Sequence, residues 1–169
     1  MTTERDVAEV RSVVYRMAGA FSAKDVDGVM ATFVGQGVTV VGTGSDEVRF
    51  GPEAVRLQVA RDISEVDTLS FGMDHVRVDV LGDAAFAFAD TVINASVGSE
   101  IIRFPIRNTF GLVRTEAGWL IAQIHTSVAS HQQDEGRSFP VRLTKTLSSL
   151  LTSIDNAAGS SAVQSKSLG

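Results

Sequence analysis

The spacing of the hydrophobic residues changes near Ser64, and this change limits the folds open to the chain. Before Ser64, hydrophobic residues recur every three or four positions, which is the period of a helix with one buried face. After Ser64 they alternate with polar residues, which is the period of a strand. Helices followed by strands, with no regular alternation between them, indicate an α+β fold.

Three helices are expected in the first part of the chain, over residues 4–22, about 26–34 and about 53–63. Asp25 is the expected N-cap of the second helix, because an aspartate side chain accepts a hydrogen bond from a free backbone N–H there. Pro52 lies at the start of the third helix, where a backbone N–H would have no partner within the helix, so the N–H that proline lacks is not missed. Two short strands, 38–41 and 47–50, are expected between the second and third helices.

Four long strands joined by tight turns are expected next, over about 69–80, 84–95, 101–114 and 119–129. The alternation changes phase near Asp74 and His75, which indicates a β-bulge. Gly82 and Asp83 are typical of a hairpin turn. The strands are therefore predicted to form an antiparallel meander.

The length of 169 residues suits one domain, predicted over 1–130. A polar connector is expected from residue 131, then an amphipathic helix over 139–154 and a mobile tail to residue 169. The N-terminus lacks the basic and apolar segments of a signal peptide, and no segment is apolar enough to cross a membrane. A cytoplasmic protein without membrane contact is the expectation.

Composition excludes several kinds of site. The chain has no cysteine, so disulfides and thiolate metal sites are absent. A net charge of −5 argues against nucleic-acid binding through a broad basic surface. His75, His125 and His131 lie in no close metal-ligand pattern, and no phosphate loop follows Gly42-x-Gly44. Neither a metal nor a cofactor is expected.

Polar residues on the last two strands suggest a pocket. Trp119, His125 and Ser127 share one strand face by alternation, and this face changes from apolar to polar along its length. The preceding strand carries Arg107 and Thr109, and the hairpin between the strands makes them neighbours of His125 and Ser127. We expect these five residues to line a pocket. Tyr15, the only tyrosine, is a further candidate for ligand binding.

Two interpretations of this cluster are open. An arginine beside a neutral histidine can hold a carboxylate or enolate oxygen, and His125 can exchange protons near neutral pH. Alternatively, Arg107 pairs with an internal acid such as Asp90 and only ties the sheet together.

Residues 20–33, residues 50–55, and the pattern Arg107-x-Thr109 followed by Gly118-Trp119 and His125-x-Ser127 resemble the SnoaL-like, nuclear transport factor 2-like superfamily. The resemblance covers about residues 5–129. It implies a cone-shaped, cystatin-like fold, in which a curved antiparallel sheet wraps around three N-terminal helices and encloses a pocket. It also implies a homodimer formed through the sheet.

The resemblance excludes some activities of the superfamily. At the catalytic positions of ketosteroid isomerases this chain has Met17, Val41 and Arg107, so that catalytic set is absent. Thr109 stands where limonene-epoxide hydrolases have an aspartate. The segment from Trp119 to Ser127 looks most like the branch that includes the association domain of calcium/calmodulin-dependent kinase II.

Three hypotheses about function follow. The first is a protein that binds a small anionic or carbonyl-bearing molecule through Arg107 and its neighbours. The second is a lyase, isomerase or cyclase acting on a polyketide-like or steroid-like substrate, with His125 as acid or base. The third is a dimerisation module without catalysis.

Overall fold

A computed structural model of the chain describes residues 4–130, 133 and 135–138. The chain divides into two units, Met1–Ala129 and Ser130–Gly169, and the elements below all belong to the first. The helix predicted over 139–154 lies outside the described residues. The elements are α1 (Glu4–Ser22), α2 (Val26–Met30), β1 (Thr39–Val41), β2 (Val48–Phe50), α3 (Pro52–Ser64), β3 (Thr68–Leu81), β4 (Ala84–Val97), β5 (Glu100–Thr115) and β6 (Gly118–Ser127).

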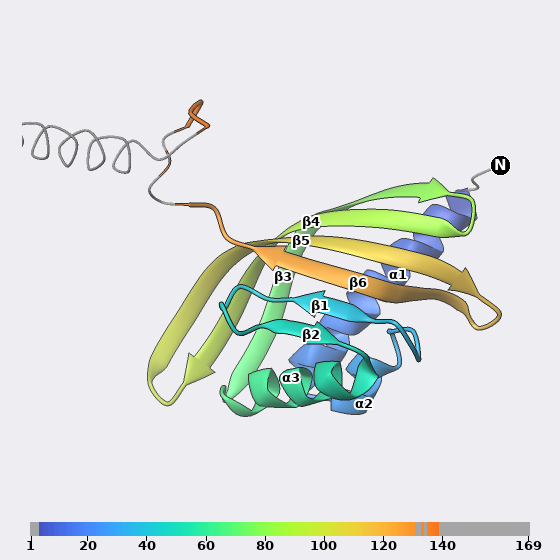
Figure 1. Ribbon diagram of the computed structural model, residues 1–169. Helices are drawn as coiled ribbons and strands as arrows, with labels where there is room; N and C mark the ends of the chain where they lie inside the picture. Colours follow the sequence, from blue (N-terminus) through green and yellow to red (C-terminus); the bar gives the residue numbers. More distant parts are fainter. Residues whose placement is uncertain (1–3, 131–132, 134, 139–169) are drawn as a thin grey trace, which may run out of the picture. The chain divides into compact units, whose positions relative to one another are not determined.

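The first unit has the predicted α+β architecture. One six-stranded sheet in the order β2-β1-β6-β5-β4-β3 curves over α1, while α2 and α3 lie beside its lower part (Figure 1). The sheet is mixed rather than antiparallel, because β1 pairs parallel with β6. The long strands β3 to β6 form the predicted antiparallel meander.

The helices form where the sequence predicts them, with one difference. Oδ1 of Asp25 accepts a hydrogen bond of 2.9 Å from Gly28 N, which confirms Asp25 as the N-cap of α2. The helix α2 ends at Met30, earlier than expected. Instead, Val34 N donates a hydrogen bond to the carbonyl oxygen of Ile121 on β6, and Ile121 N donates one to the carbonyl oxygen of Thr32. These backbone groups therefore bond to the sheet rather than within a longer helix.

Apolar residues of α1 and of the inner sheet face form the core. Val10, Val14 and Met17 of α1 are buried, as the helical stripe predicts. They pack with inward residues of the strands such as Phe110 and Ile121. The register of β3 shifts between Met73 and Val76, which confirms the predicted bulge.

A second bulge, on β6, changes which residues face the core. Gly111 pairs with Gln123, but Leu112 pairs with Ile121, so Ala122 is an extra residue on β6. A bulge of this kind interrupts the alternation of the strand. Trp119 and Ile121 therefore lie buried before the bulge, whereas Ile124 is the buried residue after it. His125 and Ser127 lie exposed on the outer face of the sheet.

Candidate functional site

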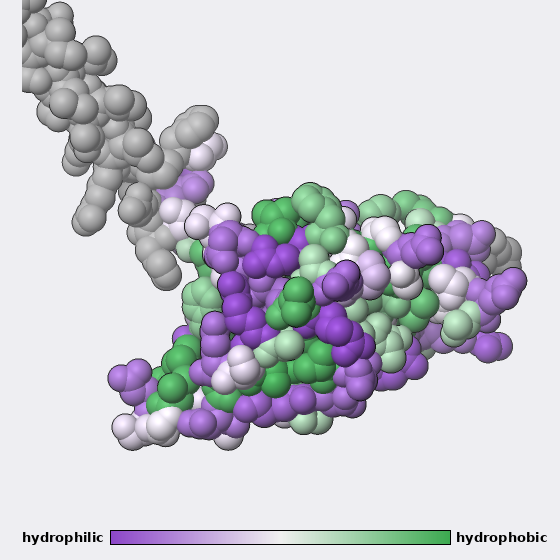
Figure 2. Space-filling view, turned by 60° about the horizontal axis from the view of Figure 1, so that its bottom comes forward, coloured by the Kyte–Doolittle hydropathy of each residue, from purple (hydrophilic) through white to green (hydrophobic). Residues whose placement is uncertain are grey.

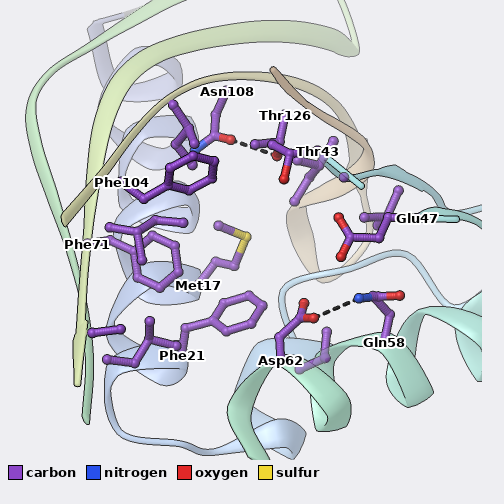
Figure 3. A pocket seen from close by; sticks show the side chains of 18 of the residues that line it. Met17, Phe21, Thr43, Glu47, Gln58, Asp62, Phe71, Phe104, Asn108 and Thr126 are labelled. Carbon is purple, nitrogen blue, oxygen red and sulfur yellow. Dashed lines mark hydrogen bonds between the residues drawn. The ribbon is translucent and has the colours of Figure 1, made fainter. Parts of the chain in front are cut away.

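A cavity of about 360 Å³ lies between α3, the C-terminal half of α1 and the inner face of the sheet. Met17 and Phe21 come from α1, and Phe71 and Phe104 come from β3 and β5 (Figure 3). The remaining aromatic residues of its wall are Phe33 and Phe110. Viewed from the side of α3, the surface shows hydrophobic residues bordered by hydrophilic ones (Figure 2). The cavity has the size and apolar wall of a small-molecule site.

A buried polar network forms part of the wall on the sheet side. Thr126 Oγ1 donates a hydrogen bond of 2.8 Å to Asn108 Oδ1. Asn108 Nδ2 in turn donates one of 3.2 Å to Thr91 Oγ1. Asn108 and Thr126 both line the cavity, and Thr43 lies near them (Figure 3). These groups can hydrogen-bond a polar atom of a ligand.

Carboxyl groups form the opposite polar part of the wall. The charged residues of the lining are Glu47, Asp62 and Glu65, and the described lining contains no arginine, lysine or histidine. Glu47 is held in place: Arg61 Nη2 donates to its Oε1 over 2.8 Å, and Gly44 N donates to its Oε2 over 2.8 Å. Arg61 also bonds Asp46 Oδ2 at 3.0 Å, so α3 is tied to the β1–β2 loop.

Asp62 is held differently from Glu47. Gln58 Nε2 donates a hydrogen bond of 2.7 Å to its Oδ1, and the nearest cationic atom, Arg61 Nε, lies 4.0 Å away. Burial beside the apolar wall raises the pKa of Asp62 to about 6, and the negative charges of Glu47 and Glu65 add to this effect. The hydrogen bond from Gln58 opposes the rise because it favours the carboxylate.

Four of the predicted site residues do not line the cavity, and the prediction that they face the interior is wrong. Arg107, Thr109, His125 and Ser127 are exposed on the outer sheet face, and the cavity is lined by the alternate residues of β5 and β6. The predicted neighbours do lie together: Arg107 is opposite Ser127 and Thr109 is opposite His125. Arg107 is also opposite Asp90 of β4.

Trp119 and Tyr15 also lie away from the cavity. Trp119 is buried on the inner face, with the Arg114 guanidinium 4.4 Å from the centre of its ring. Tyr15 is 42% exposed and borders a shallow hollow on the outer side of α1, beside Arg11 and Arg16. Neither residue is part of the cavity wall.

Sequence reasoning missed Gln58, Asp62 and Asn108. Gln58 is a polar residue among the apolar positions Val55 and Val59 of α3, and Asp62 follows it after one turn. Asn108 is the polar residue on the apolar face of β5. A polar residue on an otherwise buried face was the signal in both cases, because such a group needs a partner inside the protein.

Among residues 4–130, 133 and 135–138, no three His, Asp or Glu side chains are arranged so that together they could hold a metal ion. No helix in the part of the chain that the structure describes is long and apolar enough to cross a membrane.

A curved sheet that wraps around helices and encloses an apolar cavity defines a class of cone-shaped α+β proteins. Residues 10–131 match the SnoaL-like domain, and the chain belongs to that family. No curated protein sequence matches it significantly.

Solved structures of nuclear transport factor 2-like proteins share the fold. A superfamily member from Salmonella enterica is 14% identical, with a TM-score of 0.72, and the match covers 82% of this chain and 100% of that one. A proposed dehydratase of this family from Streptomyces avermitilis is 22% identical, with a TM-score of 0.71 and coverage of 76% and 99%.

A third similar structure is a proposed association domain of calcium/calmodulin-dependent protein kinase II from Xanthomonas campestris. It is 17% identical, with a TM-score of 0.66, and the match covers 78% of this chain and 91% of that one. At these identities the similarity establishes the fold and leaves the activity open.

Proposed function

We propose that this protein binds a small, largely apolar and uncharged molecule in the cavity beneath α3. The observation that carries the proposal is the cavity itself, whose aromatic wall has polar groups at two places. Proteins that share the fold include one named as ketosteroid isomerase-like and one proposed dehydratase. A ligand of this kind gains free energy from leaving water and is oriented by a few hydrogen bonds.

The charged residues of the cavity wall favour a neutral ligand over an anionic one. The anionic ligand expected from the sequence depended on Arg107, which lies on the outer face. The charged groups of the cavity wall are carboxyls, and a second anion placed beside Asp62 would be repelled. A neutral ligand with a carbonyl or hydroxyl group fits the wall, because Asn108, Thr126 and Thr43 can bond such a group.

Titration with prodan, a neutral fluorescent naphthyl ketone, tests this proposal. Ile102 lines the cavity and is 41% exposed, so a larger side chain there can occupy the cavity without overpacking the core. We expect Ile102→Trp to weaken prodan binding by about tenfold or more. The matched control is Ile101→Trp, because Ile101 is 87% exposed and does not line the cavity. Equal binding by both variants and the unchanged protein would contradict the proposal.

We also propose that the outer sheet face forms a homodimer. Phe86 is 56% exposed there, near the exposed Phe88, and Arg107 lies directly opposite Asp90. Among the described residues of a single chain, Arg107 and Asp90 form no ion pair with each other. An interface with two-fold symmetry brings the same patch together twice, so an arginine of one copy can meet an aspartate of the other. The relationship to a proposed kinase association domain agrees with this role.

A further inference from the structure

Glu65 is exposed, so the partly buried carboxyl groups of the cavity wall are those of Glu47 and Asp62, and Asp62 is the one positioned to act on a ligand. Both carboxylate oxygens of Glu47 accept hydrogen bonds, one from Arg61 and one from Gly44. Asp62 accepts one bond, from Gln58 to Oδ1, and its Oδ2 has no hydrogen-bond donor within the described residues. In Figure 3 the Asp62 carboxyl faces the same space as the ring of Phe21. Its second oxygen is therefore available to a bound molecule.

Gln58 fixes the orientation of this carboxyl group. Its side chain is almost fully buried, lies one turn before Asp62 on α3 and holds Oδ1 at 2.7 Å. A carboxylate held by a buried amide needs little rearrangement before it reacts. Gln58 is thus a positioning residue, while Asp62 is the group that would touch the ligand.

The surroundings of Asp62 keep its basicity high near neutral pH. On α3 itself the charged neighbours are Arg61 and Glu65, and from the β1–β2 loop Glu47 faces it. The cavity residues of α1 and β3 are uncharged, including Phe21 and Phe71. Burial raises the pKa of Asp62 to about 6. A base with a pKa near the working pH accepts protons effectively and still exists largely as the carboxylate.

We propose that Asp62 is a catalytic base that removes a proton from an activated carbon atom of a neutral molecule bound in the cavity, such as a carbon next to a carbonyl. This inference rests on the proposed ligand binding. In the step, Asp62 Oδ2 forms an O–H bond as the C–H bond breaks. The electron pair of that bond passes into the ligand, to give an enolate or to expel a leaving group. The same carboxyl group then returns its proton to the enolate or to solvent.

The proposed role of Asp62 as a base replaces the acid or base role that the sequence suggested for His125. His125 lies on the outer face of the sheet and cannot reach the cavity. The substrate class is a compact, apolar carbonyl compound, since a cavity of about 360 Å³ with an aromatic wall excludes large or highly charged molecules.

The elimination of 5-nitrobenzisoxazole tests the proposal without knowledge of the natural substrate. A base takes the single proton on the carbon of its isoxazole ring, the C–H electrons form a nitrile, and the N–O bond breaks to release a coloured phenolate. We expect saturable turnover whose rate rises with pH through an apparent pKa near 6. Asp62→Asn should lower the rate by about 100-fold, whereas Asp62→Glu should keep part of it.

Controls separate this inference from the proposed ligand binding. Asp79→Asn removes an exposed carboxylate that pairs with Arg77 on β3, and its rate should equal that of the unchanged protein. If prodan binds but Asp62→Asn turns over the probe as fast as the unchanged protein, the catalytic role is wrong and ligand binding stands. If neither prodan nor the probe binds, both proposals are wrong.

Discussion

Gln58 Nε2 donates a hydrogen bond of 2.7 Å to Oδ1 of Asp62, one turn further along α3 at the wall of the cavity. This bond favours the carboxylate form of Asp62, against the burial that favours the neutral acid. The balance between the two effects sets the charge of the cavity near neutral pH.

Replacement of Gln58 by methionine tests that balance. Methionine has a similar shape but cannot donate a hydrogen bond, so the pKa of Asp62 should rise further above 6. A titration of the Asp62 carboxyl carbon by NMR measures this change. Because Gln58 Oε1 is buried without a partner, the substitution should alter the free energy of unfolding by no more than about 1 kcal/mol. An unchanged or lower pKa would show that the bond does not govern Asp62.

Asp62 should also make stability depend on pH. Its pKa in the folded protein, about 6, lies above the ordinary value of 3.8. Between these values the folded chain binds a proton that the unfolded chain has released, so the contribution of Asp62 to stability falls as pH rises through this window. At neutral pH, Asp62→Asn should be more stable than the unchanged protein. We expect at most about 1 kcal/mol, because the side chain is 40% exposed and solvent screens its charge.

Urea unfolding at a series of pH values measures this difference. The advantage of Asp62→Asn should disappear near pH 4, where Asp62 is protonated in the folded protein. If the stability advantage of Asp62→Asn over the unchanged protein instead grew as the pH was lowered, the raised pKa of Asp62 would be contradicted.

The buried network around Asn108 should contribute to stability. Thr91→Val removes the acceptor of the 3.2 Å hydrogen bond from Asn108 Nδ2 and leaves that donor buried. We expect a loss of about 2 kcal/mol in the free energy of unfolding. Thr109→Val is the matched control, because Thr109 is exposed, and its effect should stay within about 0.5 kcal/mol. Equal losses in the two variants would show that the buried hydrogen bond contributes no more to stability than an exposed threonine does.

The outer sheet face should control the oligomeric state. In the double variant Phe86→Asp and Phe88→Asp, like charges would meet across the proposed dimer interface, and sedimentation velocity should detect monomers. Leu57→Asp provides the control, since Leu57 is 68% exposed on α3 and does not belong to the sheet. A monomeric unchanged protein, or a dimer that survives the double change, would refute this interface.

The fold could be predicted from the sequence because each element carries a local signal. The apolar stripe of α1, the cap at Asp25 and the change of phase at Asp74 each depend on neighbouring residues alone. The pairing of β1 with β6 could not be predicted in this way, because two short strands do not specify their partner in a sheet.

The site could be predicted only in part, for two physical reasons. The bulge at Ala122 reverses the phase of β6, so Trp119 and His125 do not share a face as strict alternation requires. Polar residues on β5 such as Arg107 were also interpreted as a pocket wall, although an outer face is polar simply because it meets water. Of the polar groups of the cavity, Asn108 is a single polar residue on the apolar face of β5, and Asp62 lies between Arg61 and Glu65 on α3, so neither belongs to a recognisable motif.

The central claim is that the cavity beneath α3 holds the ligand, and NMR of the protein labelled at the methionine methyl groups tests it most directly. Met17 lines the cavity, whereas Met30 and Met73 are partly buried residues outside its wall. On addition of prodan, the methyl signal of Met17 should shift and show contacts to the naphthyl protons, while those of Met30 and Met73 stay in place. Binding of prodan that leaves the Met17 signal unchanged would contradict the account.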